Sequence, residues 1–545
     1  MILGKKSPSK AELEQLQKLY KTDEKIGERL GGVPSYLVAY WRRKKNIPKY
    51  SLPKFPESEI RNLWERYGDD DKCGMELGIS KAAFYNWRRK YGLKEKPLFL
   101  KLEQLEFNFP GTKSSAGAMT LFGKQTISQK IIAGLSDREK IEVGETVELE
   151  PDLAVTDNEI ERIIEIFEES GSNFLWNPSK NVLINNLLEN SPMGLSLSDK
   201  KLRDFARLQK IRKFYDIFTG YTQRLIIENG IAHPGKLIIG NSFEIFSVAA
   251  LTAMPFKINS NEMASLWGSG KLTITVPSTI RIELGGRKVR SISARDIGLH
   301  VMDKLSGENL TGKAIEYYGS VISHFSIGER SKLASTSYGL NVSSVICQYD
   351  ASVRRYLRNL TNFTFPAMAA DKDAVYESYF HINIEKLLPQ IAGPNDILKI
   401  KTVAELESLT VSQIFLGGPE SGKYEDLRIA ADILKGEKVD KNCRLFIIPA
   451  SRKVYLEALR KGLIRIFSES GAIILPAGYN LTLMNIMTML SSDEVCLTTV
   501  HSHMIEKQEK NLPIKQDNDF YLCSSSTAAA SAVKAEISDP IRFLS

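Results

Sequence analysis

The chain has 545 residues, of which 43% are hydrophobic and 25% are charged. This ordinary composition excludes a disordered or fibrous chain, and the length is too great for one hydrophobic core, so three or four domains are expected. No run of eighteen apolar residues occurs, which argues against a membrane-spanning helix.

The cysteines and the N-terminus predict a cytoplasmic protein. The five cysteines are scattered, and no two of them have the C-x-x-C spacing of a zinc ribbon or a redox site. The residues after Met1 lack the long apolar stretch of a signal peptide. We therefore expect a reducing compartment and no disulfide framework.

The net charge of +8 comes from the first hundred residues. Residues 1–100 carry 22 Lys and Arg against 13 Asp and Glu, a net of +9, whereas the remainder carries 51 against 52. A basic segment of this kind is expected of a surface that binds a polyanion. A lysine-rich solubilising arm is the plainer alternative, but such an arm has no need of recurring apolar and aromatic positions.

Two copies of one short pattern lie within this basic segment. Gly27 matches Gly74, and the sequence Trp-Arg-Arg-Lys recurs at residues 41–44 and 87–90, one residue short of the same offset. Apolar residues at helical spacing and a capping residue such as Ser80 predict short helices joined by tight turns. Each copy therefore has the rhythm of a helix–turn–helix unit.

The last helix of each copy has the composition of a recognition helix, because Asn and Arg suit base edges and Arg and Lys suit phosphates. Residues 79–92 resemble the helix–turn–helix of transposase-like and homeodomain-like DNA binders. In the alternative, Trp41 and Trp87 are core residues and the arginines form a solvated or protein-docking face. The predicted DNA-binding residues are Arg42, Arg43, Lys44, Lys81, Tyr85, Asn86, Arg88, Arg89 and Lys90.

Beyond a predicted linker at residues 97–120, β-rich apolar runs alternate with helical segments, which predicts an α/β fold. Residues 122–132 match the opening helix of a known family, residues 423–431 match its R-x-E-D-L-R-x-A-A helix, and residues 524–533 match its closing alanine-rich helix. Further matches lie at residues 236–240, 270–277 and 387–392. On these segments, residues 121–545 resemble the aconitase superfamily, most closely the isopropylmalate/homoaconitate dehydratase large subunit.

This resemblance implies an α/β body with three α/β/α domains, preceded by a small all-α region of tandem helix–turn–helix repeats. The family's catalytic swivelling domain has no counterpart in the chain and is a separate subunit in the most similar relatives. A small swivel-domain subunit is therefore a candidate partner. The expected boundaries are 1–50 and 51–96 for the repeats, and 121–295, 296–400 and 401–545 for the three domains.

The resemblance also places the family's functional positions on residues that differ. Pro419, Tyr479 and Thr482 stand where three cysteines hold a [4Fe–4S] cluster, so no cluster and no other cofactor is expected. The D-S-H signature aligns with Ser242-Phe243-Glu244 and the D-H pair with Asn185-Asn186. The G-x-x-H-Q histidine aligns with Gln223, and the carboxylate-binding arginine with Ser502. Dehydration needs a Lewis acid, a base and cations, so no catalytic residue is assigned.

Residues 417–423 meet most of the P-loop pattern, but Tyr424 replaces the residue that would hold magnesium. The amides of this helix N-terminus, with a lysine beside them, could still bind a carboxylate or phosphate, although the family likeness already explains the glycines. The predicted ligand-binding residues are Gly417, Gly418, Ser421, Gly422 and Lys423.

Cys496, His501 and His503 lie close in sequence and have side chains that bind zinc. Asp493 or Glu494 could complete the shell. A His-x-His loop usually holds no metal, so this trio is a weak candidate, and otherwise no metal is expected.

These observations together predict a DNA-binding protein, a transcriptional regulator, whose catalytically degenerate body senses a small carboxylic acid. The alternative is a hydro-lyase or isomerase of altered chemistry without the usual cluster, in which His501 and His503 are needed. A third hypothesis is a structural protein whose body pairs with an ordinary dehydratase subunit while the repeats bind protein.

Overall fold

The computed structural model describes residues 7–49, 55, 57–67, 70–77, 79–93, 124–185, 197–361, 363, 365–479, 489–491, 493–501, 503–504 and 518–544. The chain forms two compact units, residues 1–116 and 117–545, and each is described by itself. The predicted linker at 97–120 lies outside the described residues. None of the described helices is long and apolar enough to cross a membrane.

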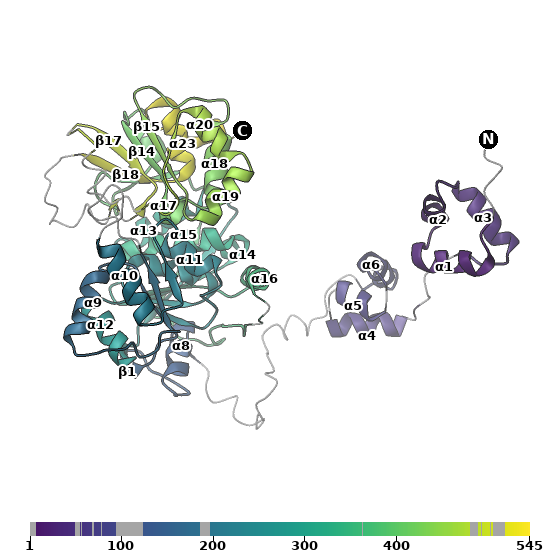
Figure 1. Cartoon of the computed structure of the whole chain (residues 1–545), viewed down its shortest axis with the longest axis horizontal. Helices are drawn as coiled ribbons and strands as arrows, with labels where there is room; N and C mark the ends of the chain where they lie inside the picture. The colour runs from purple at the N-terminus through teal and green to yellow at the C-terminus, as the bar shows by residue number, and fades with distance from the viewer. Residues whose placement is uncertain are drawn as a thin grey trace. The chain divides into compact units, whose positions relative to one another are not determined.

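The first unit holds two three-helix bundles, so the helices predicted for the repeats are confirmed (Figure 1). Each bundle has its own apolar core, with Val38 and Trp41 buried in one and Ile60 and Phe84 in the other. The predicted cap is present, because the Ser80 hydroxyl accepts a hydrogen bond from a backbone amide of the last helix. The helices are α1 (Lys10–Tyr20), α2 (Asp23–Arg29), α3 (Ser35–Lys44), α4 (Glu57–Tyr67), α5 (Asp70–Glu76) and α6 (Lys81–Lys90).

The second unit begins with a five-stranded parallel sheet of order β4-β3-β2-β5-β6. Its central strands are buried on both faces, as expected where helices cover a parallel sheet. A two-stranded antiparallel ribbon of β1 (Thr146–Leu149) and β7 (Leu272–Thr275) accompanies it. The strands are β2 (Leu153–Thr156), β3 (Asn181–Ile184), β4 (Lys213–Tyr215), β5 (Leu237–Gly240) and β6 (Met254–Lys257), and the helices are α8 (Ile127–Leu135), α9 (Ile160–Glu169), α10 (Leu197–Leu208), α11 (Thr222–Glu228), η1 (Phe243–Leu251) and α12 (Ser260–Ser269).

The second sheet is parallel throughout, with the order β10-β9-β8-β11. A single hydrophobic cluster joins its strands to those of the first sheet. The strands are β8 (Thr279–Gly285), β9 (Ala314–Tyr318), β10 (Ser344–Cys347) and β11 (Ser378–Asn383), and the helices are α13 (Ala294–Leu305), α14 (Ser320–His324), α15 (Ile327–Thr336), η2 (Ser337–Leu340) and α16 (Ala351–Leu360).

The third sheet has seven strands in the order β13-β12-β18-β17-β14-β15-β16, with its own apolar core. Figure 1 shows β14, β15, β17 and β18 grouped with α18, α20 and α23 at the C-terminal end of the body. The strands are β12 (Gln390–Ala392), β13 (Ile400–Thr402), β14 (Gln413–Gly417), β15 (Arg444–Ile448), β16 (Ile473–Ile474), β17 (Val495–Thr498) and β18 (Asp519–Cys523). The helices are η3 (Val403–Leu406), α17 (Gly418–Ser421), α18 (Tyr424–Leu434), α19 (Arg452–Arg460), α20 (Leu463–Ser470), α23 (Ser525–Lys534) and η4 (Pro540–Phe543).

The sheets divide the body earlier in the sequence than the boundaries predicted at 295 and 400. Strand β8 precedes residue 295, yet it pairs with β9 and β11 of the second sheet. Strand β12 precedes residue 400, yet it pairs with β18 of the third sheet. These assignments depend on hydrogen bonds between strands that are far apart in the sequence. The local sequence pattern does not reveal which strands pair.

The first sheet has a topological switch point between β2 and β5. The chain adds β3 and β4 on one side of β2 and then returns to place β5 and β6 on the other side. Crossover connections diverge at such a point, so the carboxyl ends of the two strands leave room for polar side chains and ligands. This edge of the sheet holds the side chains described next.

Candidate active site at the carboxyl ends of the strands

Three carboxylates from three strand ends gather in the body. Asp157 follows β2, Glu244 lies in η1 directly after β5, and Glu420 lies in α17 directly after β14. The Ser242 hydroxyl donates to Asp157 Oδ2 at 2.8 Å. Gln223, near the start of α11, links the other two, because its amide donates to Glu244 Oε2 at 3.3 Å and its Nε2 donates to Glu420 Oε1 at 3.1 Å.

The environment of this cluster favours protonated acids. Burial raises the pKa of Asp157. Burial, together with repulsion from Asp157 and Glu420, raises the pKa of Glu244 well above its ordinary value. Of two like charges in one buried place, at least one keeps its proton. Burial also raises the pKa of the Tyr221 phenol well above its ordinary value, so this hydroxyl stays protonated.

A fully buried arginine holds Glu420. Arg295 of α13 and Glu420 both have exposed side-chain fractions of 0%, and Nη2 of the arginine lies 3.6 Å from Oε2 of the carboxylate. The guanidinium also donates to Thr499 O at 3.2 Å and to Thr336 Oγ1 at 3.0 Å. Its Nη1 lies 3.3 Å from His501 Nδ1. Burial and the arginine charge lower the pKa of His501 well below its ordinary value, so the imidazole is neutral and Nδ1 accepts.

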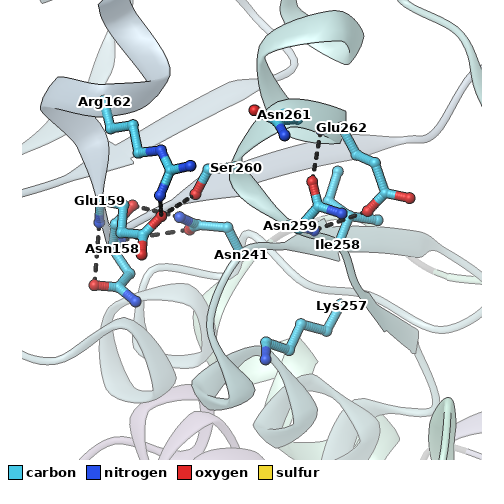
Figure 2. A pocket seen from close by; sticks show the side chains of 10 residues that line it. All are labelled: Asn158, Glu159, Arg162, Asn241, Lys257, Ile258, Asn259, Ser260, Asn261 and Glu262. Carbon is cyan, nitrogen blue, oxygen red and sulfur yellow. Dashed lines mark hydrogen bonds and ion pairs between the residues drawn. The ribbon is translucent and has the colours of Figure 1, made fainter. Parts of the chain in front are cut away.

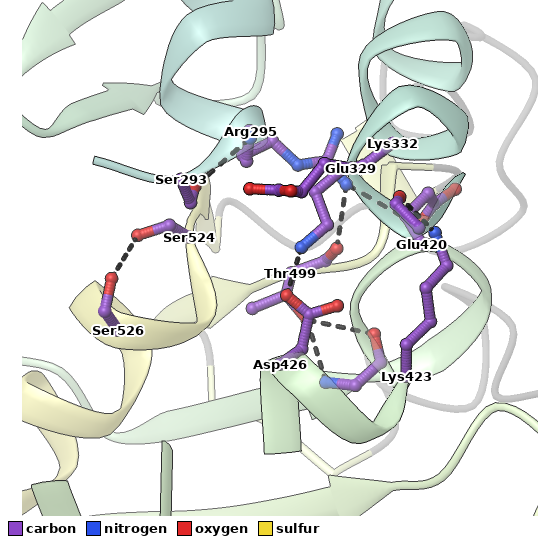
Figure 3. Close-up of polar contacts among 12 residues, drawn as sticks. Ser293, Arg295, Glu329, Lys332, Glu420, Lys423, Asp426, Thr499, Ser524 and Ser526 are labelled. Atoms are coloured by element: carbon purple, nitrogen blue, oxygen red, sulfur yellow. Dashed lines mark hydrogen bonds and ion pairs between the residues drawn. The ribbon is translucent and has the colours of Figure 1, made fainter. Parts of the chain in front are cut away.

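A second set of buried charges adjoins Arg295 (Figure 3). Lys332 of α15 forms an ion pair with Asp426 of α18. Lys423 donates from Nζ to the Gly328 carbonyl oxygen at 2.8 Å. Burial, assisted by the positive charge of Lys332, lowers the pKa of Lys423 to about 7. These groups connect α15 to α18 inside the protein.

The structure places the residues of the predicted anion cradle inside the fold. A Cβ atom at Gly417 would lie 2.1 Å from the carbonyl oxygen of Ile448 in β15, and one at Gly422 would lie 2.4 Å from the same oxygen. The glycines permit this close backbone approach. The Lys423 ammonium points to a carbonyl within the fold. All five predicted residues are buried, namely Gly417, Gly418, Ser421, Gly422 and Lys423.

The candidate zinc trio is also not brought together. Cys496 lies buried in β17, and burial raises the pKa of its thiol well above the ordinary value. His501 Nδ1 faces Arg295, whereas His503 Nδ1 lies 2.9 Å from Thr498 Oγ1. Within the described ranges, no group of three or more His, Cys, Asp or Glu side chains could hold a metal ion.

In the N-terminal bundles, two of the nine predicted DNA-binding residues have a structural role. Arg42 pairs with Asp23 at 3.0 Å, and Arg88 pairs with Asp70 at 2.5 Å. Each arginine also donates to a carbonyl oxygen five residues further along the chain. Arg42 is only 5% exposed. These two arginines therefore fasten the last helix of each bundle to the middle helix and do not face a partner.

The repeated glycines have the same kind of explanation. A Cβ atom at Gly27 would lie 2.0 Å from the Val33 carbonyl oxygen, and one at Gly74 would lie 2.8 Å from the Ile79 carbonyl oxygen. Each glycine lets the turn approach the middle helix of its bundle. The other seven predicted residues are exposed, namely Arg43, Lys44, Lys81, Tyr85, Asn86, Arg89 and Lys90.

The residues that replace the family's catalytic groups lie in different parts of the structure. Glu244 and Gln223 belong to the carboxylate cluster, although the sequence analysis assigned them no role and noted only that they replace catalytic residues of the family. Asn185 is buried and donates to Asp199 and Asp216, whereas Asn186, Ser502 and Thr482 lie outside the described residues. The prediction missed Asp157, Glu420 and Arg295. One signal was available for Asp157, because this acidic residue directly follows the apolar strand Leu153–Thr156.

Comparison with known proteins identifies similar chains. Residues 196–535 match the family model described as aconitase family (aconitate hydratase). The chain is 31% identical over 425 residues to 3-isopropylmalate dehydratase large subunit 1 of Methanopyrus kandleri, which covers 77% of this chain and 100% of that protein. It is 33% identical over 426 residues to the 3-isopropylmalate dehydratase large subunit of Elusimicrobium minutum, covering 77% and 99%.

Two further comparisons add to these. The probable methanogen homoaconitase large subunit of Methanosarcina mazei is 31% identical over 378 residues, covering 69% of this chain and 95% of that protein. The crystal structure of Thermococcus kodakaraensis aconitase X gives a TM-score of 0.41 at 11% identity, covering 70% of this chain and 90% of that one. That structural likeness is too low to support an inference.

These relatives overturn two of the expectations drawn from the sequence. The prediction of a DNA-binding transcriptional regulator is wrong, because the relatives that cover most of the chain are named as dehydratase and homoaconitase large subunits. No finding supports DNA as a partner. The expectation that no cofactor is used is contradicted as well, because the family to which these relatives point uses a [4Fe–4S] cluster.

The residues at the expected cluster positions do not supply the family's ligands. Pro419 is buried in α17 and offers no donor atom. Tyr479 stacks on Phe218, and its carbonyl oxygen accepts the Tyr221 hydroxyl at 2.5 Å. Burial raises the pKa of the thiols of Cys443, Cys496 and Cys523, which therefore keep their protons. We assign no chemical step to a cluster.

Proposed function

Because the chain belongs to the aconitase family, we propose that it is the large subunit of a hydro-lyase. Its substrate class is a small hydroxy acid with two or more carboxylates, from which the enzyme removes water or to whose unsaturated product it adds water. The observation that carries the proposal is the pair of buried acids Asp157 and Glu244 at the switch point, both of whose pKa values burial raises.

Dehydration of a hydroxy acid requires two proton transfers. A base removes the proton on the carbon next to a carboxylate, and an acid protonates the hydroxyl that leaves as water. Two acids whose environments separate their pKa values are suited to these complementary roles. We assign the acid role to Glu244. We assign the base role to Asp157, whose carboxylate accepts the Ser242 hydroxyl at 2.8 Å.

The remaining polar groups position this pair. Gln223 donates from its backbone amide to Glu244 and from its side chain to Glu420, so it positions the proposed acid Glu244 relative to Glu420. Arg295 holds Glu420 from the opposite side. A rigid and largely dry setting keeps the acid oriented and strengthens its electrostatic interactions.

The proposed partner is a small subunit. The relatives are named as large subunits, and the chain covers nearly their whole length, so this chain would take the same place in an assembly. The small subunit would close over the carboxyl edge of the first sheet and contribute further contacts to the substrate. Water exclusion by such a closure favours proton transfer between the substrate and the two acids.

The test is turnover by the full chain mixed with a small subunit from the same host. Formation of the unsaturated acid from 3-isopropylmalate is followed by its ultraviolet absorbance. Glu244→Gln keeps the shape but cannot give up a proton, so kcat should fall by about 100-fold or more. Glu308 is an exposed glutamate, so Glu308→Gln is the control. This variant should retain the wild-type kcat. Wild-type kcat in Glu244→Gln would contradict the assignment.

The pH dependence gives a second expectation. Activity requires the protonated form of Glu244, and its pKa lies well above the ordinary carboxyl value. The rate should therefore fall as the pH rises through that raised pKa, and it should also fall at acidic pH, where the proposed base Asp157, whose pKa burial raises, takes up a proton. A profile in Glu244→Gln with the same alkaline limb would show that another group titrates.

A further inference from the structure

A pocket of about 480 Å³ includes in its lining Asn158, the residue that follows the proposed base Asp157 (Figure 2). It lies at the switch point, where the loops after β2, β5 and β6 meet the first turns of α9 and α12. Its lining is polar apart from one isoleucine and consists of Asn158, Glu159, Arg162, Asn241, Lys257, Ile258, Asn259, Ser260, Asn261 and Glu262.

The pocket adjoins the loop that carries the proposed base. Asn241 Oδ1 accepts from the backbone amide of Asp157 at 3.1 Å and from that of Asn158 at 3.4 Å. The next residue, Ser242, donates to the Asp157 carboxylate. A molecule in the pocket would therefore contact the loop that carries Asp157.

Two cations line this pocket. The Arg162 side chain is 64% exposed, and its ion pair with Glu159 is long, at 3.8 Å. Lys257 is exposed and donates to the Tyr338 hydroxyl at 3.0 Å. Both carboxylates of the lining have other contacts, because Glu159 accepts from the Ser260 hydroxyl and Glu262 accepts from the Asn259 amide at 2.8 Å.

The buried cation of the neighbouring cluster cannot serve a ligand in the same way. Arg295 is 0% exposed, and its guanidinium contacts Glu420, Thr336, Thr499 and His501 inside the protein. A substrate with several carboxylates would meet the Asp157 and Glu244 acids and needs a compensating positive charge. At the open edge, Arg162 and Lys257 provide that charge, and the first turns of α9 and α12 add amide dipoles of the same sign.

We propose that this pocket is a carboxylate-binding subsite in which Arg162 and Lys257 hold the carboxylates of a hydroxy acid, with asparagine amides around its polar atoms. The guanidinium fork suits the two oxygens of one carboxylate, and the lysine acts as a point charge on the opposite wall. The inference rests on the proposed function for its substrate class. The binding itself requires no turnover.

The experiment is calorimetric titration of the full chain with malate, a hydroxy acid with two carboxylates, at constant ionic strength. Arg162→Gln and Lys257→Gln should each raise the Kd by about tenfold or more, since each removes a charge-assisted contact. Arg207→Gln is the matched control, because Arg207 also forms an exposed pair with an acid three residues earlier in a helix. This control should bind malate like the wild type.

The outcomes separate this subsite from the proposed reaction. Tight malate binding that both variants weaken supports the subsite, even where no hydroxy acid is turned over and the proposed function fails. An absence of malate binding overturns the subsite, as does a Kd unchanged in both variants. Turnover with wild-type KM in Arg162→Gln and Lys257→Gln would also overturn the subsite while leaving the hydro-lyase activity in place.

Discussion

At the scale of single residues, the role inferred for a side chain changes once its contacts in the folded protein are known. Arg42 and Arg88 are of the residue type that contacts nucleic acids, yet each forms an ion pair with an aspartate inside its own bundle. Glu244 stands at a replaced family position, yet it lies with two other carboxylates in one buried cluster. Burial and partner identity decide these roles, and neither is visible in a residue type.

Arg42→Gln tests the structural role of the repeated arginine. The change leaves Asp23 without its ion-pair partner in a half-buried place, so the free energy of unfolding of the first bundle should fall by about 2–3 kcal/mol. Loss of helical circular dichroism on heating measures it. Lys44→Gln removes an exposed charge from the same helix and should have little effect; equal stability of the two variants would contradict the assignment.

Lys423 provides a pH-dependent contribution to stability. Its pKa is about 7 in the folded protein and 10.5 ordinarily, so between these values the unfolded state binds more protons. The free energy of unfolding should therefore rise with pH from about 7 to about 10.5. Urea unfolding of the wild type and of Lys423→Met across this range would reveal the slope, which the variant should lose. Parallel curves for the two proteins would refute this contribution.

At the scale of helices and strands, local pattern and long-range pairing differ in what they reveal. The three helices of each repeat follow from apolar spacing and from caps such as Ser80, and the structure confirms them. The sequence also shows that Gly27 and Gly74 occupy matching positions in the two repeats. Their cause, a carbonyl oxygen within 3 Å of a Cβ position, depends on the tertiary approach of the turn.

The candidate site shows the same limit. Asp157, Glu244 and Glu420 each follow a strand, and an acid after an apolar run is a readable signal. Their convergence requires the order of strands in two different sheets. Arg295 gives no local signal at all, because it is a charged residue in a helix whose neighbours become buried only in the folded body.

At the scale of the whole molecule, the N-terminal bundles and the body carry different kinds of information. The family and its relatives concern the long body, with residues 196–535 matching the family model. The prediction of a regulator rested on the positive charge of residues 1–100. The body, in contrast, matches a family of metabolic enzymes.

The most direct test of the hydro-lyase assignment is nuclear magnetic resonance of 3-isopropylmalate in heavy water with the full chain and a small subunit. Reversible loss and return of water would place deuterium on the carbon next to the carboxylate and would produce a signal from the unsaturated acid. The account predicts both changes, and it predicts that Glu244→Gln abolishes them together. A substrate spectrum that stays unchanged over hours, with the two subunits shown to be associated, would contradict the central claim.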